Sequence, residues 1–265
     1  MNEGGVGLIQ LSLFYGILIL PLALLWWLGL RQLVRGLIVG VARMTLQLGL
    51  IGIYLKFLFD QDSLWLNVFW LLVMVAVANL HILTRAGISK KHLFWVSQFS
   101  LLVGVGIVLF GMILVVQPEP WYQTRYLIPL AGMLLGNCLT GNILVLDRFY
   151  SAVSERYEQF MGDLLLGAGV YEALQPFVRN ALQAALSPIV ATLTTLGVVA
   201  LPGMMTGQIL GGAEPVEAVI YQIMIMLGIA SSMVVCAVLN IMLSIRLAFD
   251  GYGLLNRSIM LSPER

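Results

Sequence analysis

Very few side chains in this sequence combine a charged or reactive group with a position inside a long apolar run. Arg43 is one of them, and Gln47 follows it at the spacing that places both on one face of a helix. A charge within membrane hydrocarbon is costly, so an intramembrane arginine is a functional-site hypothesis by default. The guanidinium could line a polar interior, or it could snorkel to the lipid headgroups. Lys56, near the end of the same run, is expected to snorkel.

Small residues give the fifth apolar run a different character. Asn137 accompanies a ridge of glycines and threonine, which allows helices to pack closely or to contact a solute. Gly104 and Gly111, in the preceding run, are expected to serve close packing as well.

The sequence Leu201–Pro202–Gly203 interrupts the sixth apolar run. Proline removes a backbone hydrogen bond and clashes with the preceding turn, so we expect a kink or break near Pro202. Irregular backbone at membrane depth is tolerated where it is buried in protein or lines a cavity. We therefore expect a translocation pathway lined by the following polar, thioether and helix-breaking residues: Arg43, Gln47, Asn137, Pro202, Met204, Met205, Gln222 and Met226.

The potential metal ligands do not identify a metal. Methionines cluster between residues 204 and 242; thioethers bind soft metals such as Cu(I), but methionine also fills irregular gaps in a core. Glu214 and Glu217 are weak candidates for a hard cation, and solvated loop charge is the alternative. Cys138 and Cys236 fall inside apolar runs and give neither a disulfide framework nor a metal-ligand spacing.

Catalytic motifs are missing from the sequence. It contains no His-Glu-x-x-His, no Cys-x-x-Cys and no Gly-x-x-x-x-Gly-Lys-Ser/Thr phosphate loop. We therefore expect a transport subunit and not an enzyme. If ATP drives transport, ATP and Mg²⁺ bind to a partner chain, and we expect this chain itself to bind no cofactor.

The composition shows what must position these residues. Of 265 residues, 60% are apolar and 10% are charged, and the mean hydropathy is +0.96, as is typical of an integral membrane protein. A hydrocarbon core of about 30 Å needs about 20 apolar residues per helix. Seven runs predict an all-α protein with about seven transmembrane helices: Leu8 to Leu30, Gly36 to Phe59, Leu64 to Leu83, Leu93 to Val116, Tyr126 to Leu146, Ala185 to Leu210, and Ala218 to Ile245.

The placement of lysine and arginine predicts the orientation of these helices. If the N-terminus is outside and the C-terminus is cytoplasmic, 11 of the 14 basic residues fall in inside segments. Glu119, Glu214 and Glu217 then lie outside. The sequence therefore predicts a multi-pass protein of the plasma (inner) membrane with an odd number of spans.

One block of 33 residues, Asp147 to Arg179, holds eight charged side chains and cannot lie in lipid. Its apolar residues recur at spacings of three and four on both sides of Leu166–Gly167–Ala168, which predicts two amphipathic helices joined by a glycine turn. Such a pair could dock a cytoplasmic protein, or it could lie on the headgroups as an interfacial hairpin. Without a linker between folding units, we treat residues 1–265 as one domain, with residues 147–180 as its cytoplasmic coupling segment.

Four strings of residues carry a resemblance that covers essentially the whole chain. They are Arg43-Met-Thr-Leu-Gln-Leu48, Ile128-Pro-Leu-Ala-Gly-Met133, Leu201-Pro-Gly-Met-Met-Thr-Gly207 and Tyr221-Gln-Ile-Met224. Together with Leu166–Gly167–Ala168 they resemble the FetB-type family of ABC transporter permeases, which includes a bacterial iron exporter and plant aluminium-tolerance relatives.

The resemblance implies a permease that exports iron or a related metal, with two copies pairing with two cytoplasmic ATP-binding-cassette proteins. Leu166–Gly167–Ala168 resembles the core of the loop by which importer permeases contact their ATPase. The chain departs from that loop at Met161, where a glutamate is usual, and at Pro188, which lies further along than the loop's proline. By this likeness the ATPase-coupling residues are Asp163, Gly167, Ala168, Tyr171, Glu172 and Arg179.

Two other functions are open on the sequence. Plant relatives have been linked to UDP-glucose, and a nucleotide sugar would need cationic phosphate contacts, for which Arg43 is the buried candidate. The other alternative is a membrane scaffold that transports nothing. A net charge of +1 gives no indication of nucleic-acid binding.

Overall fold

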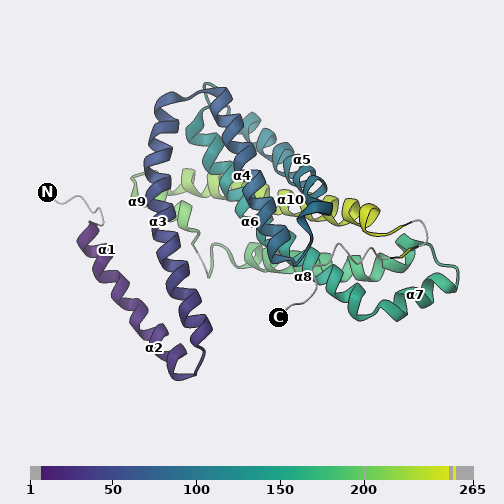
Figure 1. Cartoon of the computed structure of the whole chain (residues 1–265). Helices are drawn as coiled ribbons and strands as arrows, with labels where there is room; N and C mark the ends of the chain where they lie inside the picture. The colour runs from purple at the N-terminus through teal and green to yellow at the C-terminus, as the bar shows by residue number, and fades with distance from the viewer. Residues whose placement is uncertain (1–6, 200, 251–252, 255–265) are drawn as a thin grey trace. The chain divides into compact units, whose positions relative to one another are not determined.

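The structure is a computed structural model that describes residues 7–199, 201–250 and 253–254, and this part of the chain is all-helical, with no strand (Figure 1). The chain divides into two compact units, Met1–Gln61 and Asp62–Arg265. The first contains α1 (Leu8–Phe14), the 3₁₀ helix η1 (Tyr15–Leu18), α2 (Ile19–Trp27) and α3 (Arg31–Gln61). The second contains α4 (Leu64–Arg85), α5 (Lys90–Val116), α6 (Thr124–Glu155), α7 (Tyr157–Leu165), α8 (Val170–Thr195), α9 (Gly203–Leu210) and α10 (Pro215–Ala248).

The first unit is a helical hairpin. Its first arm, α1–η1–α2, turns back through Gly29, which adopts φ +75° and so takes a conformation that other residues rarely adopt. Further along, the Tyr15 hydroxyl lies 2.5 Å from the Thr45 hydroxyl of α3, which itself donates to the Val41 carbonyl at 2.9 Å. One polar contact therefore bridges the two arms where they diverge.

The second unit is a bundle in which α10 packs along α5, α6 and α8, while α6 also packs on α4. Its core is continuous from Val75 on α4 to Ala248 at the end of α10. At one end of the bundle Asp62 Oδ1 accepts hydrogen bonds from the backbone N–H (2.8 Å) and the hydroxyl (2.7 Å) of Thr124. This contact satisfies the first exposed donor of α6 and holds the start of that helix beside α4.

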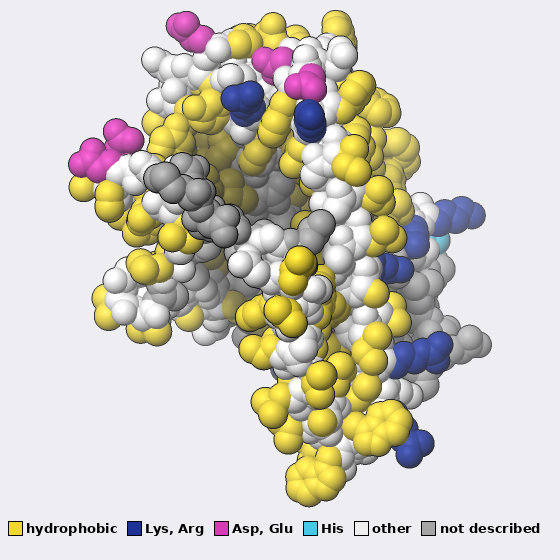
Figure 2. All heavy atoms as spheres, turned by 90° about the vertical axis from the view of Figure 1, so that its left-hand side faces the viewer, with side chains coloured by type: hydrophobic (Ala, Val, Ile, Leu, Met, Phe, Trp, Pro, Cys, Tyr) yellow, Lys and Arg dark blue, Asp and Glu magenta, His cyan; other side chains and the backbone are white. Residues whose placement is uncertain are grey.

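Within the described residues, six helical segments are long and apolar enough to cross a membrane: Ile9–Trp27, Arg31–Gln61, Leu64–Arg85, Lys90–Val116, Thr124–Glu155 and Pro215–Ala248. Hydrophobic side chains cover much of the face shown in Figure 2. Exposed apolar helices of this length are stable in lipid and not in water. The protein is therefore a multi-pass membrane protein.

The predicted seventh span is not confirmed. The run from Ala185 to Leu210 is divided between the end of α8 and the short helix α9, and between them residues 196–199, 201 and 202 are not helical. The expected break is thus present, but it begins six residues before Pro202, directly after the end of α8, where Gly197 adopts φ +85°. Pro202 serves as the N-cap of α9.

Gly104 on α5 marks a close approach to α10. A Cβ atom placed there would lie 2.4 Å from the Cys236 Sγ and 3.0 Å from the Cys236 backbone nitrogen. The expected close packing at Gly104 is therefore present. At Gly111, two turns later, a Cβ would meet nothing within 4 Å, so the same expectation for Gly111 was wrong.

This difference predicts the result of a matched pair of substitutions. Gly104→Ala is expected to destabilise the protein by about 1–3 kcal/mol, because the backbone of α10 must move to admit the methyl group. Gly111→Ala is expected to be neutral or slightly stabilising, since alanine is the better helix former. Denaturant unfolding in detergent measures both. Equal losses at the two positions would contradict the close approach.

Candidate functional site

The polar block forms a helix, a tight turn and a second helix. α7 ends in a Schellman motif: the N–H of Gly167 donates to the Leu164 carbonyl at 3.0 Å, and the N–H of Ala168 donates to the Asp163 carbonyl at 3.1 Å. Gly167 has φ +98°, which only glycine adopts readily. The first backbone N–H before α8, that of Gly169, donates to the Glu172 carboxylate at 3.4 Å. The glycine turn is thus defined by local hydrogen bonds at both ends.

An aromatic cluster fixes this block to the bundle. The ring of Phe160 on α7, which is fully buried, lies 5.5 Å from the ring of Phe249, which follows α10. Phe249 in turn lies 6.5 Å from Phe149 on α6. The guanidinium of Arg156, between α6 and α7, lies 5.0 Å from the centre of the Phe177 ring on α8. A displacement of α7 would therefore be transmitted to α6, α8 and the end of α10.

Large apolar side chains are exposed around the glycine turn. Leu165 and Leu166 are 84% and 89% exposed, and Tyr171 is 52% exposed. Beside them is a cavity of about 420 Å³ lined by Asp163, Leu166, Gly167, Ala168, Glu172 and Ala173. We call Leu165, Leu166, Tyr171 and the residues lining this cavity the docking surface.

The docking surface brings together five of the six predicted coupling residues: Asp163, Gly167, Ala168, Tyr171 and Glu172. Arg179 is exposed further along α8 and lines neither this cavity nor its neighbour of about 320 Å³, which includes Tyr171 and Glu172. Leu166 was named in the sequence as part of the loop core, but it was not counted among the coupling residues, and Leu165 was not predicted at all. The signal for both was their position as adjacent leucines beside a glycine turn in a block with eight charges.

In the second unit the predicted pathway residues do not share a cavity with the docking surface. Asn137 is half-buried, and its amide donates to the Met133 carbonyl of its own helix at 2.9 Å. Gln222 is 9% exposed, and its Oε1 has no hydrogen-bond partner among the described residues. Pro202, Met204, Met205 and Met226 are half-buried, and Met204 and Met226 pack against the core.

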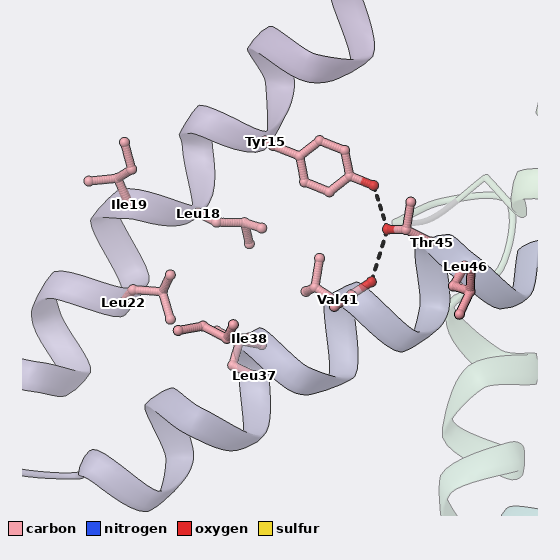
Figure 3. Close-up of a pocket in the computed structure, with 10 residues that line it drawn as sticks. Tyr15, Leu18, Ile19, Leu22, Leu37, Ile38, Val41, Thr45 and Leu46 are labelled. Carbon is pink, nitrogen blue, oxygen red and sulfur yellow. Dashed lines mark hydrogen bonds between the residues drawn. The ribbon is translucent and has the colours of Figure 1, made fainter. Parts of the chain in front are cut away.

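In the first unit Arg43 and Gln47 are exposed on α3. The cavity of this unit, about 560 Å³ between the diverging arms, is lined by apolar side chains together with Tyr15 and Thr45 (Figure 3). Neither Arg43 nor Gln47 lines it. This cavity lacks the charge and the amide that a polar solute would require.

A buried polar stripe, which the sequence analysis did not identify, runs through the second unit. Ser232, Cys236, Asn240 and Ser244 recur every fourth residue along α10, and all are buried. Asn240 Nδ2 donates to Asn142 Oδ1 on α6 (2.9 Å) and lies 3.1 Å from Ser97 Oγ on α5. Such bonds join transmembrane helices. The stripe therefore holds α5, α6 and α10 together.

The weak metal candidates lie at the surface. Glu214 and Glu217 are both exposed at the start of α10. Across residues 7–199, 201–250 and 253–254, no group of three or more His, Cys, Asp or Glu side chains could hold a metal ion.

Comparisons with known proteins point to one family. The family described as "Uncharacterised protein family (UPF0014)" matches residues 8–249. The chain is 36% identical over 212 residues to a UPF0014 membrane protein of Synechocystis sp., covering 80% of this chain and 82% of the relative. It is 36% identical over 194 residues to Protein ALUMINUM SENSITIVE 3 of Arabidopsis thaliana, covering 72% and 68%.

A third relative carries a name that states an activity. The chain is 34% identical over 186 residues to the "Probable iron export permease protein FetB" of Escherichia coli, covering 70% of this chain and 71% of the relative. The resemblance expected from the motifs is therefore confirmed. No solved structure matches the chain significantly.

Proposed function

The chain belongs to the UPF0014 family, and from this membership we propose that it is the membrane-spanning permease subunit of an ATP-driven transporter. The observation that carries the proposal is the docking surface. A tightly defined glycine turn presents Leu165 and Leu166 outward from the most polar block of the sequence, where no apolar core covers them. Exposed apolar residues grouped in this way mark a contact with a protein or with a membrane. Because they lie in a block with eight charges, we assign the contact to a protein.

The proposed partner is a cytoplasmic ATP-binding-cassette protein, and two copies of each chain form the transporter. The docking surface then faces the cytoplasm, the N-terminus lies outside, and the protein resides in the plasma membrane. The partner supplies ATP and Mg²⁺, in agreement with the absence of a phosphate loop from this sequence.

The aromatic cluster suggests how the partner would act on the membrane helices. Closure of the partner around ATP would push α7 and the start of α8. Phe160 would pass this displacement to Phe249, and Arg156 would pass it to Phe177. Because packed helices move as units, a shift at this end could open or close a path elsewhere in the bundle.

Iron or a related metal is the proposed solute, and export the proposed direction, because the Escherichia coli relative is named as an iron export permease. Affinity purification of the tagged chain from its native membrane tests the pairing, and an ATP-binding protein should be recovered with it. Flux of radiolabelled iron into inside-out proteoliposomes containing both chains tests the solute. Recovery of no ATP-binding protein would favour the membrane scaffold instead.

A nucleotide sugar is the second candidate solute. The reason is Arg43, whose exposed guanidinium lies on a helix that can span the membrane. Arg43→Gln is expected to lower UDP-glucose flux about tenfold or more if that solute is carried, because a charge-assisted bond to phosphate is lost. Iron flux should be unchanged.

Lys56→Gln provides the matched control, since Lys56 is another exposed cation on α3. Labelled UDP-glucose and labelled iron are measured in parallel for both variants. A tenfold loss of iron flux in Arg43→Gln alone would contradict the assignment of Arg43 to phosphate.

A further inference from the structure

The outer face of α8 carries polar groups far beyond the docking surface. Gln183, Ser187, Ala191 and Thr194 are all exposed, and their spacing of three and four residues places them in one stripe. Val190 and Leu193, which are 57% and 38% exposed, are the large apolar side chains beside this stripe. The opposite face buries apolar residues, namely Leu174, Phe177, Ala181, Ala185 and Ile189. We call the exposed stripe from Gln183 to Thr194 the polar face of α8.

Two other long helices of the second unit, α5 and α10, have the opposite pattern. The exposed residues of α5 include Phe99, Ile107 and Phe110, and those of α10 include Ile223 and Leu227. Those helices present hydrocarbon outward and polar groups inward, as lipid requires. A helix that is apolar toward its neighbours and polar outward has instead the pattern of a helix facing water.

The polar face lies in an uncharged part of the chain, and the proposal takes this part to enter the membrane, although α8 is not one of the six candidate spans found among the described residues. No charged residue occurs between Arg179 and Glu214. At 1.5 Å per residue, Ala191 lies about 18 Å along the helix axis from Arg179. The hydroxyls of Ser187 and Thr194 donate to carbonyls of their own helix and would be tolerated by lipid, but the Gln183 amide is exposed and would not.

The interruption after α8 supports the same conclusion. Val198 and Val199 are 90% and 78% exposed within residues 196–199, where the chain has left α8. Backbone that leaves a helix at membrane depth must be buried in protein or must line a water-filled cavity. A surface cavity of about 490 Å³ already lies along α8, lined by Leu182, Gln183, Leu186, Ser187, Val190 and Ala191.

From these observations we infer that the polar face of α8 and residues 196–199, which follow it, line a water-filled path through the membrane. The inference rests on the proposed function and names the wall along which the solute passes. That wall offers amide and hydroxyl groups and no carboxylate, because the sequence has no acidic residue between Glu172 and Glu214. A solute that keeps its hydration shell or its own ligands fits this wall; a bare hard cation, which requires carboxylate or carbonyl oxygens, does not.

Cysteine labelling in intact membranes tests the path. The native thiols of Cys138 and Cys236 are fully buried, and both are replaced by alanine. Single cysteines are then introduced as Gln183→Cys, Ser187→Cys, Ala191→Cys and Thr194→Cys, with Ile223→Cys and Leu227→Cys as lipid-facing controls. A charged methanethiosulfonate should label the polar face about tenfold faster than the controls or more, because it reacts with thiolate, which forms in water and not in lipid.

Two results would overturn the inference. Labelling no faster than in the controls would mean that lipid covers the polar face. Oxidative cross-linking of two copies through these cysteines, without aqueous labelling, would mean that a second copy covers it. If the chain without Cys138 and Cys236 does not fold, the wild-type background serves instead, with its own labelling subtracted.

The labelling needs neither ATP nor a partner chain. Rapid labelling without a recoverable ATP-binding protein would therefore leave the path standing and remove the proposed coupling. Slow labelling together with a recovered ATP-binding protein would remove the path and leave the proposed coupling standing.

Discussion

The double substitution Leu165→Ser, Leu166→Ser is expected to weaken binding of the ATP-binding partner about a hundredfold, since burying each leucine in a contact contributes about 1.5 kcal/mol or more. The thermal stability of the chain itself should not change, because these side chains are 84% and 89% exposed. Co-purification in a dilution series gives the affinity, and stimulated ATP hydrolysis gives the coupling.

A third exposed leucine provides the control for this variant. Leu210, at the end of α9, is 84% exposed and lies outside the docking surface. Leu210→Ser should leave partner binding intact. Undiminished binding in the double variant would assign Leu165 and Leu166 to the headgroup region, as in an interfacial hairpin, and would refute the docking surface.

Phe160→Ala is expected to lower the free energy of unfolding by about 3–5 kcal/mol, the usual range for removing a buried aromatic ring. Phe160 is fully buried and in edge contact with Phe249, so its removal leaves a cavity at the junction of α7 with the bundle. Denaturant unfolding of the purified chain measures the loss. If the aromatic cluster transmits force, ATP hydrolysis in the Phe160→Ala variant should no longer depend on transport. The ATP-binding partner should stay bound.

Phe110→Ala is the matched control for Phe160→Ala. The Phe110 ring is 62% exposed on α5, so its removal should cost the chain much less stability in detergent. A similar loss in both variants would show that the cluster of Phe149, Phe160 and Phe249 has no special part in holding α7.

The apolar runs predicted most of the membrane helices well. The run from Leu64 to Leu83 became α4 at Leu64–Arg85, and the run from Leu93 to Val116 became α5 at Lys90–Val116. Hydrophobic length alone decides such helices, because lipid leaves the backbone no other partner than its own helix. The same rule could not show that α6 continues nine residues past Leu146 into the polar block, since α-helical bonding is equally favourable in water.

Breaks in helices were harder to predict than helices. The chain leaves helical geometry at Arg156, where no glycine or proline gives a signal, and the reason is tertiary: the guanidinium lies over the Phe177 ring of α8. The predicted face of Phe149, Val153 and Phe160 is nonetheless buried, because α7 turns with the same side toward the core.

For the candidate site, the sequence located the segment but not the side chains that matter most. Gly167 and Glu172 were found because glycine and charge are conspicuous in an apolar sequence. Leu165, Leu166 and the buried Asn240 have types that occur throughout the chain, and only their surroundings in the structure distinguish them.

The near contact between Gly104 and Cys236 limits how the transporter can change shape. Two helices that meet almost backbone to backbone cannot slide or rotate past each other without first separating, which would also break the hydrogen bond from Asn240 on α10 to Ser97 on α5. α5 and α10 would then act as a stationary frame during each cycle. The helices that move during the cycle would be α7 and α8, and they would move relative to α5 and α10.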